Sequence, residues 1–470
     1  MIRSRRSLCT LLIMTSSILW LSGCYPKRIV WTPDGRWAAV STDNGLFFID
    51  PNGKIVDTLP GRVLHARWSP DGRHLAIERH LYAQQWKDVE TSLPKPCRDE
   101  LVQYAQPLLT VKNKDEWQTR ITMLRNIDKI SKNHIHGIKL YLRDNAPEDF
   151  PKDLIASWKD DCDFNCYSLQ LGVWKHQTFT LQKTLFSSAQ RIWDMTFSRK
   201  GQVLAFTTAI LEEEDDDDIH HPSSLWAVDI KTEELILLDR NIALYPDWGP
   251  QGSFLYYTRS VEETPDDHTI STILKIRVCD PNGALYNSDQ EKPTAIVGLL
   301  ANDFTRVHCL SDGRILFSSI EVTLPAISKD VPDYTQLFLF DPQRPTTLTR
   351  LIPRGVLPQT HDYDLDFFEV SPDEHFISFP EGHGRVAVLS IQTGEFKILQ
   401  HADLNTLITV PVWRAPSDLC YIDQCVSKDE PASKDSLKQV VLQEVKANAW
   451  QTPRSISTHW PLHVKKDWLE

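Results

Sequence analysis

A six-residue motif recurs along the chain and constrains its fold more than any other feature. WTPDGR and WSPDGR are the clearest copies, and the seven copies begin at Trp31, Trp68, Phe197, Trp248, Cys309, Val370 and Trp413. In such a motif, proline presets the first central φ of a type I turn, aspartate suits the second position, and glycine accepts the left-handed residue that follows. Each copy is therefore predicted to be a turn that joins two antiparallel strands.

The segments that follow each copy complete a repeating unit. A strand-like run such as VLAFTTAI (203–210) comes first, then a second strand and turn such as SLWAVDIKTEE (224–234), and finally a short apolar run such as LILL (235–238). Four antiparallel strands per repeat make one propeller blade. The sequence predicts an all-β propeller over residues 24–470 with seven four-stranded blades.

The repeat also carries a family resemblance. An aromatic-Ser-Pro-Asp-Gly-Arg turn, followed by LAF-like and LWAVD-like strands, resembles the WD40-like (PD40) repeat of TolB-type β-propellers. The resemblance implies a propeller that binds other envelope proteins, and it says nothing of chemistry, because the repeated residues build blade corners. TolB-type proteins are generally soluble and carry a separate amino-terminal α/β domain, whereas here Trp31 follows Cys24 by seven residues. We therefore expect a TolB-like fold without TolB's own partners.

The first 24 residues have the pattern of a bacterial lipoprotein signal. Three arginines precede an apolar run (8–21) that is too short to span a bilayer comfortably, and Leu21-Ser22-Gly23-Cys24 resembles the lipobox. This pattern predicts a signal peptide over residues 1–23 and lipidation of Cys24, with acyl chains that keep the protein on a membrane. Tyr25 follows the cysteine where the enteric inner-membrane retention signal has aspartate, which favours the outer membrane.

The charge of the chain argues against a nucleic-acid partner. The formal net charge is −12, and removal of residues 1–23, which hold three arginines and no acid, makes it −15. No other stretch is long and apolar enough to span a bilayer. We expect a lipid-anchored envelope domain that faces the periplasm.

A long insertion separates the second and third copies of the motif. Residues 81–166 fall between the second and third strands of the second blade and have a helical pattern, with apolar residues Trp117, Ile121, Leu124, Ile127 and Ile130 on one face. A second helix is expected at 98–105. The insertion is interpreted either as a lid or partner-docking element, or as a decoration packed on its own blade.

Seven cysteines remain after Cys9 and Cys24 are set aside. The close pairs Cys162/Cys166 and Cys420/Cys425 are disulfide candidates in an oxidising compartment, with Cys97 a rival partner for the first pair. Cys279 and Cys309 lie in strand-like patterns and are expected to be buried apolar residues.

Two other groups of polar residues were weighed as sites. The acidic run LEEEDDDDIHHPSS (211–224) ends near His220 and His221, but unspaced acids repel, so a solvated loop is expected rather than a cation site. The polar residues His308, His361, Asp362 and Asp364 are ones that a catalytic channel would use, although a structural role is expected for them.

No local catalytic motif is present. The chain lacks a GxSxG elbow, an HExxH helix, a phosphate-binding glycine loop and a dinucleotide fingerprint. We predict no catalytic, cofactor-binding or metal-binding residue, and Cys24 is the only site residue assigned.

Three functions remain open. The favoured one is a lipid-anchored scaffold that binds another envelope protein. The second is a propeller that binds a glycan or small ligand. The third is a channel-centred hydrolase or lyase, which predicts acids, histidines or a metal converging from at least three blades.

Overall fold

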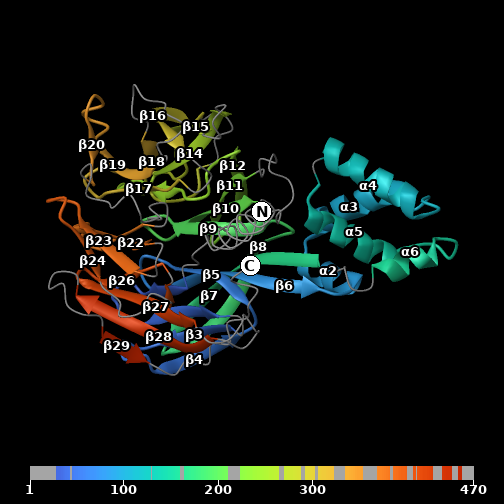
Figure 1. Cartoon of the computed structure of the whole chain (residues 1–470), viewed down its shortest axis with the longest axis horizontal. Helices are drawn as coiled ribbons and strands as arrows, with labels where there is room; N and C mark the ends of the chain where they lie inside the picture. Colours follow the sequence, from blue (N-terminus) through green and yellow to red (C-terminus); the bar gives the residue numbers. More distant parts are fainter. Residues whose placement is uncertain are drawn as a thin grey trace, which may run out of the picture.

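The computed structural model of this chain is an all-β propeller with a helical insertion on one side (Figure 1). The residues that it describes are 28–42, 45–128, 130–158, 164–209, 223–263, 269–286, 292–301, 305–321, 334–352, 368–381, 385–399, 406–408, 410–426, 437–446 and 454–457. Neighbouring strands are antiparallel, and each four-stranded sheet uses its strands in chain order. The predicted signal peptide, Cys24 and the acidic run up to residue 222 lie outside the described residues.

The first three blades each contain four strands. Blade one has β1 (Ile29–Trp31), β2 (Ala38–Thr42), β3 (Gly45–Ile49) and β4 (Ile55–Pro60). Blade two has β5 (Val63–Trp68), β6 (His74–Ala83), β7 (Phe164–Lys175) and β8 (Thr178–Ser188). Blade three has β9 (Arg191–Phe197), β10 (Val203–Ala209), β11 (Ser224–Asp229) and β12 (Leu235–Arg240).

The next three blades repeat this order. Blade four has β13 (Asp247–Trp248), β14 (Phe254–Glu263), β15 (Thr269–Arg277) and β16 (Thr294–Ala301). Blade five has β17 (Val307–Cys309), β18 (Ile315–Glu321), β19 (Tyr334–Phe340) and β20 (Leu348–Arg350). Blade six has β21 (Glu369–Val370), β22 (Phe376–Glu381), β23 (Arg385–Ser390) and β24 (Phe396–Leu399).

The C-terminal sheet departs from the four-stranded form. It contains β25 (Thr406–Ile408), β26 (Val412–Ala415), β27 (Asp418–Val426), β28 (Leu437–Lys446) and β29 (Arg454–Ser457), and both β25 and β26 pair with β27. Pro411, which has no N–H to donate, lies between the two inner segments. The prediction of seven four-stranded blades is therefore wrong in number, because six sheets have four strands and the last has five.

The repeated motif forms the predicted turn between the first two strands of a blade. In blade two, the Gly72 N–H donates to the Ser69 carbonyl (2.9 Å), and the Ser69 hydroxyl donates to Asp71 Oδ1 (2.5 Å). Gly72 has a φ of 67°, in the left-handed region that glycine enters at little cost. Glu374 replaces this glycine in blade six and adopts φ 59°, while its carboxylate accepts hydrogen bonds from Ser311 of blade five.

The tryptophans that open the motif link consecutive sheets. In three of them the indole N–H donates a hydrogen bond of 3.0 Å to a backbone carbonyl of the preceding sheet. The pairs are Trp68 to Val30, Trp248 to Thr196 and Trp413 to Glu369. Each acceptor is the residue just before the preceding copy of the motif. These tryptophans therefore tie each sheet to the one before it.

A separate hydrophobic cluster fills each interface between consecutive sheets. The first lies between blades one and two, and the last lies between blade six and the C-terminal sheet. Leu171, Ile192 and Phe206, for example, pack between blades two and three. Inner and outer strands are rich in β-branched and aromatic residues, which suit such pleated, doubly covered surfaces. The core is therefore a ring of inter-blade layers.

The C-terminal sheet lies against blade one (Figure 1). A Cβ atom on Gly35 would stand 2.7 Å from the Arg414 carbonyl, and the Arg414 guanidinium lies over the Trp31 ring at 5.7 Å. The Trp31 indole N–H is buried without a hydrogen-bond partner in the described part of the chain. This junction thus lacks the indole link that Trp68, Trp248 and Trp413 supply elsewhere.

Helices lie between β6 and β7. They are α2 (Trp86–Ser92), α3 (Lys95–Ala105), the 3₁₀ turn η1 (Gln106–Leu108), α4 (Lys114–Asp128), α5 (Lys132–Asn145) and α6 (Lys152–Ser157). Among the residues that the structure describes, no helix is long and apolar enough to cross a membrane. Helices α3 and α4 match the two predicted segments, whereas α2, α5 and α6 were not predicted.

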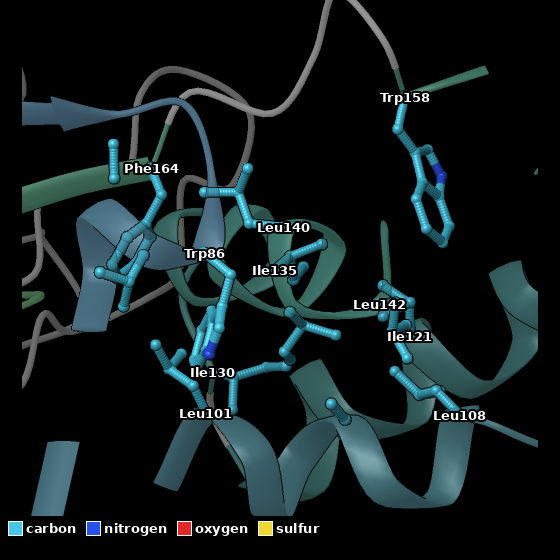
Figure 2. Close-up of a cluster of buried hydrophobic side chains, with 14 of the residues drawn as sticks. Trp86, Leu101, Leu108, Ile121, Ile130, Ile135, Leu140, Leu142, Trp158 and Phe164 are labelled. Carbon is cyan, nitrogen blue, oxygen red and sulfur yellow. The ribbon is translucent and has the colours of Figure 1, made fainter. Parts of the chain in front are cut away.

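These helices share a hydrophobic core of their own. Figure 2 shows Trp86, Leu101 and Ile135 from different helices around Phe164, which begins β7. The insertion contacts its own blade, where Asn133 Nδ2 donates to the carbonyls of Asn165 and Ala189. It is therefore a packed unit seated on the end of blade two.

Candidate functional site

A charged pocket of about 120 Å³ lies where the innermost strands of blades two to six converge. The residue just before the motif lines it in every one of these blades, namely Arg67, Thr196, Asp247, His308 and Glu369. Side chains alternate along a strand, so the residues two positions earlier, Asp194 and Arg306, join the same lining. The matching positions in the two remaining sheets hold buried Val30 and Val412. The pocket lining therefore comes from blades two to six.

Ion pairs between neighbouring blades organise this pocket. His308 Nδ1 lies 2.9 Å from Asp247 Oδ2, which also accepts the Cys309 N–H at 3.0 Å. Arg306 Nη1 lies 3.0 Å from Glu369 Oε1 and donates to the Phe368 carbonyl at 2.8 Å. Each pair joins one inner strand to the next, and together they fix the positions of four polar side chains.

Burial and pairing act in opposite directions on these charges. Burial disfavours ionisation of Asp247, but His308 and the Cys309 N–H outweigh it and hold the pKa of Asp247 below its ordinary value of 3.8. Burial likewise disfavours the charged form of Arg306, whereas Glu369 and then Asp194 raise the pKa of Arg306. Both Asp247 and Arg306 are therefore charged at neutral pH.

The predicted polar residues are only partly placed. His308 lies in the pocket, while His361, Asp362 and Asp364 lie outside the described residues. Acids and a histidine converge from four blades, through Asp194, Asp247, His308 and Glu369. This is the arrangement that the hypothesis of a channel-centred hydrolase or lyase predicts. Within the described ranges, no group of three His, Cys, Asp or Glu side chains could hold a metal ion. The sequence signal that was missed is the residue just before each copy of the motif, because its side-chain type differs from copy to copy.

A larger cleft of about 1020 Å³ separates α2 and α3 from the strands of blade two. Its walls include Arg62, Arg79 and His80, and the side chains of Leu81 and Tyr82 on β6 are 47% and 48% exposed. Leu93, Pro94, Leu185, Phe186 and Leu235 supply further apolar surface. No aspartate or glutamate belongs to the described lining, although acids outnumber bases by 63 to 51 in the chain. The cleft is apolar and cationic on an acidic protein.

The polar side of the cleft is fixed by hydrogen bonds. Arg62 Nη1 lies 3.1 Å from His80 Nδ1 and donates to the Tyr82 hydroxyl at 2.5 Å. His80 Nε2 lies 2.7 Å from Asn165 Oδ1, and its ring stacks on Tyr167 with centroids 5.0 Å apart. Burial lowers the pKa of His80 to about 4, so the neutral ring accepts from Arg62 and donates to Asn165.

A buried acid stands behind this wall. Glu78 is fully buried on β6, and its Oε1 accepts the Ile192 N–H of blade three at 3.0 Å. Burial raises the pKa of Glu78 to about 8, against the opposing charge of Arg191, the Ile192 hydrogen bond and the charge of Arg62. Glu78 is therefore largely protonated at neutral pH.

The cysteines correct one expectation. Cys420 and Cys425 both belong to β27, and an extended strand separates residues five apart by about 16 Å, beyond the limit of about 7 Å for a disulfide. Cys97 and Cys166 are free thiols that line the cleft, and Cys162 lies outside the described residues. Cys279 and Cys309 are buried, as predicted.

Comparisons with known proteins bear on the fold. No protein-family model matches this chain, and no curated protein sequence matches it. Solved structures with a similar fold include TolB from Acinetobacter baumannii, which is 15% identical with a TM-score of 0.37 over 60% of this chain and 58% of TolB. The propeller fold itself is established by the strand order of this chain.

Two enzymes of known structure are also similar. Oligogalacturonate lyase from Vibrio parahaemolyticus is 9% identical over 79% of this chain and 75% of the lyase, with a TM-score of 0.40. Acylaminoacyl peptidase from Pyrococcus horikoshii is 9% identical over 90% of this chain, with a TM-score of 0.44, and this chain spans 50% of the peptidase. These likenesses concern the fold alone.

Proposed function

We propose that this protein is a lipid-anchored propeller of the bacterial cell envelope that holds another envelope protein in the cleft between α2–α3 and blade two. The lipobox-like Leu21-Ser22-Gly23-Cys24 supports the anchor and an outer-membrane location facing the periplasm. Trp31 follows Cys24 by seven residues, so blade one stays near the lipid surface. The partner would thus be met at the membrane.

The character of the cleft carries this proposal. Exposed Leu81 and Tyr82 stand beside Arg62 and Arg79, and the described lining has no carboxylate. An apolar patch with a cationic border fits a partner segment that combines apolar side chains with acids. We therefore propose an acidic, amphipathic segment of an envelope protein as the occupant.

The test is site-specific photo-crosslinking in intact cells. A photoreactive residue replaces Tyr82 in the full-length chain, and the matched control replaces Leu348 on β20, which is 51% exposed. We expect one protein to crosslink from position 82 and none from position 348, and the crosslinked peptide identified by mass spectrometry should be acidic and amphipathic. Equal crosslinking from both positions, or a basic peptide at position 82, would reject the cleft as the docking site.

The anchor is tested separately. Cys24→Ser should abolish incorporation of labelled palmitate and release the protein from the membrane fraction. Persistent labelling or membrane retention of this variant would overturn lipidation at Cys24, whatever the crosslinking shows.

A further inference from the structure

The charged pocket of the channel contains an arginine that pairs directly with none of the acids around it. Arg67 lines the pocket from β5 and is half-buried. Asp247 is paired with His308, and Glu369 is paired with Arg306. Arg306 is also under the influence of Asp194. The side chain of Arg67, by contrast, makes no ion pair or hydrogen bond with the residues that the structure describes.

We infer that this pocket binds a small carboxylate ligand, with the guanidinium of Arg67 as its principal anchor. The planar fork of an arginine presents two parallel N–H groups that match a carboxylate. A partly buried guanidinium without an acceptor loses hydrogen bonds to water, and a bound carboxylate would restore them. This site lies in the channel and is independent of the cleft proposed above.

The size of the pocket limits the ligand. A volume of about 120 Å³ is far below the 300–1,000 Å³ of sites for drug-sized molecules. It admits a compact molecule of a few non-hydrogen atoms. A folded partner or an oligosaccharide would not enter it.

The charges around Arg67 favour a single negative charge on that ligand. Asp194, Asp247 and Glu369 lie in the same lining and would repel a doubly charged phosphate more strongly than a monocarboxylate. Of these acids, Asp247 is paired with His308 and Glu369 with Arg306. The pocket therefore selects a monocarboxylate over phosphate.

Calorimetric titration of the full-length protein in detergent tests this inference. Acetate, lactate and inorganic phosphate are added separately at constant ionic strength. We expect saturable binding of at least one of the two carboxylates, and weaker binding of phosphate. No saturable binding of acetate or lactate, or tighter binding of phosphate, would overturn the inference.

Variants assign the binding to Arg67. Arg67→Gln should weaken carboxylate binding about tenfold or more, because a charge-assisted, bidentate contact is lost. Arg67→Lys keeps the charge, so its carboxylate affinity should lie between those of the wild type and Arg67→Gln. This variant decides the matter if Arg67→Gln does not fold. Arg73→Gln, an exposed position in the adjacent turn, should bind as the wild type does. Unchanged affinity in both Arg67 variants would show that another residue binds the ligand.

Discussion

His308 Nδ1 lies 2.9 Å from Asp247 Oδ2, and the two residues occupy the same position in neighbouring blades, one residue before the repeated turn. The repeat thus uses one backbone position for different chemistry in each blade. Around the pocket this position holds Arg67, Thr196, Asp247, His308 and Glu369. The repeated turn therefore places a different side chain in the channel in each blade.

The Asp247–His308 pair predicts sensitivity to acid. Because the pKa of Asp247 is held below 3.8, its ionised form stabilises the fold above that pH, and this contribution is lost as the pH falls below about 4. Asp247→Asn should lower the free energy of unfolding at pH 7 by about 1–3 kcal/mol. Its stability should also fall less steeply between pH 5 and 2 in urea titrations. A slope equal to that of the wild type would contradict the prediction, and the exposed Asp312→Asn serves as control.

The indole links between sheets predict a difference between two tryptophans. Trp248 donates to the buried strand of blade three, whereas Trp31 has a buried N–H without a partner in the described structure. Trp248→Phe should therefore destabilise the protein by about 1–2 kcal/mol more than Trp31→Phe does. Thermal or urea unfolding measures both. Equal losses would mean that the hydrogen bond adds nothing beyond ring packing.

The contact between blade one and the C-terminal sheet predicts a costly glycine substitution. Gly35 and Gly313 both have positive φ, 67° and 90°, but only Gly35 faces a backbone carbonyl, that of Arg414. Gly313→Ala should cost about 1 kcal/mol for its backbone conformation alone. Gly35→Ala should cost at least about 1 kcal/mol more, because β26 must move away. Proteolysis within the C-terminal sheet should then be faster in Gly35→Ala than in Gly313→Ala.

The buried Glu78 predicts a pH dependence of stability opposite to that of Asp247. Its pKa is raised to about 8 from an ordinary 4.5, so its protonated form is fully favourable to folding below pH 4.5. That contribution declines by about 1 kcal/mol per pH unit and is lost as the pH rises through 8. Glu78→Gln keeps the shape without the charge and should be more stable than the wild type at pH 8.5. Parallel stability profiles of the two proteins between pH 5 and 8.5 would refute this account.

The sequence by itself determined the blade, because the turn residues act locally. Proline, aspartate and glycine impose the same corner wherever they occur together, and the flanking β-branched runs impose strands. Helix α4 could be predicted for the same reason, since its apolar periodicity is a local signal. Helix α5 escaped prediction although Ile138, Leu140 and Leu142 are buried, because nearly every turn of it meets a neighbour.

Only the tertiary structure decided which side chains meet. Arg67 and Glu369 are about three hundred positions apart in the chain, yet both line one pocket because each lies one residue before the repeated turn motif on an inner strand of the propeller. The five-stranded C-terminal sheet and its contact through Arg414 likewise depend on where the chain returns to blade one. A local pattern specifies each corner, but the register between distant strands determines the channel and the cleft, and that register is set by packing across the ring.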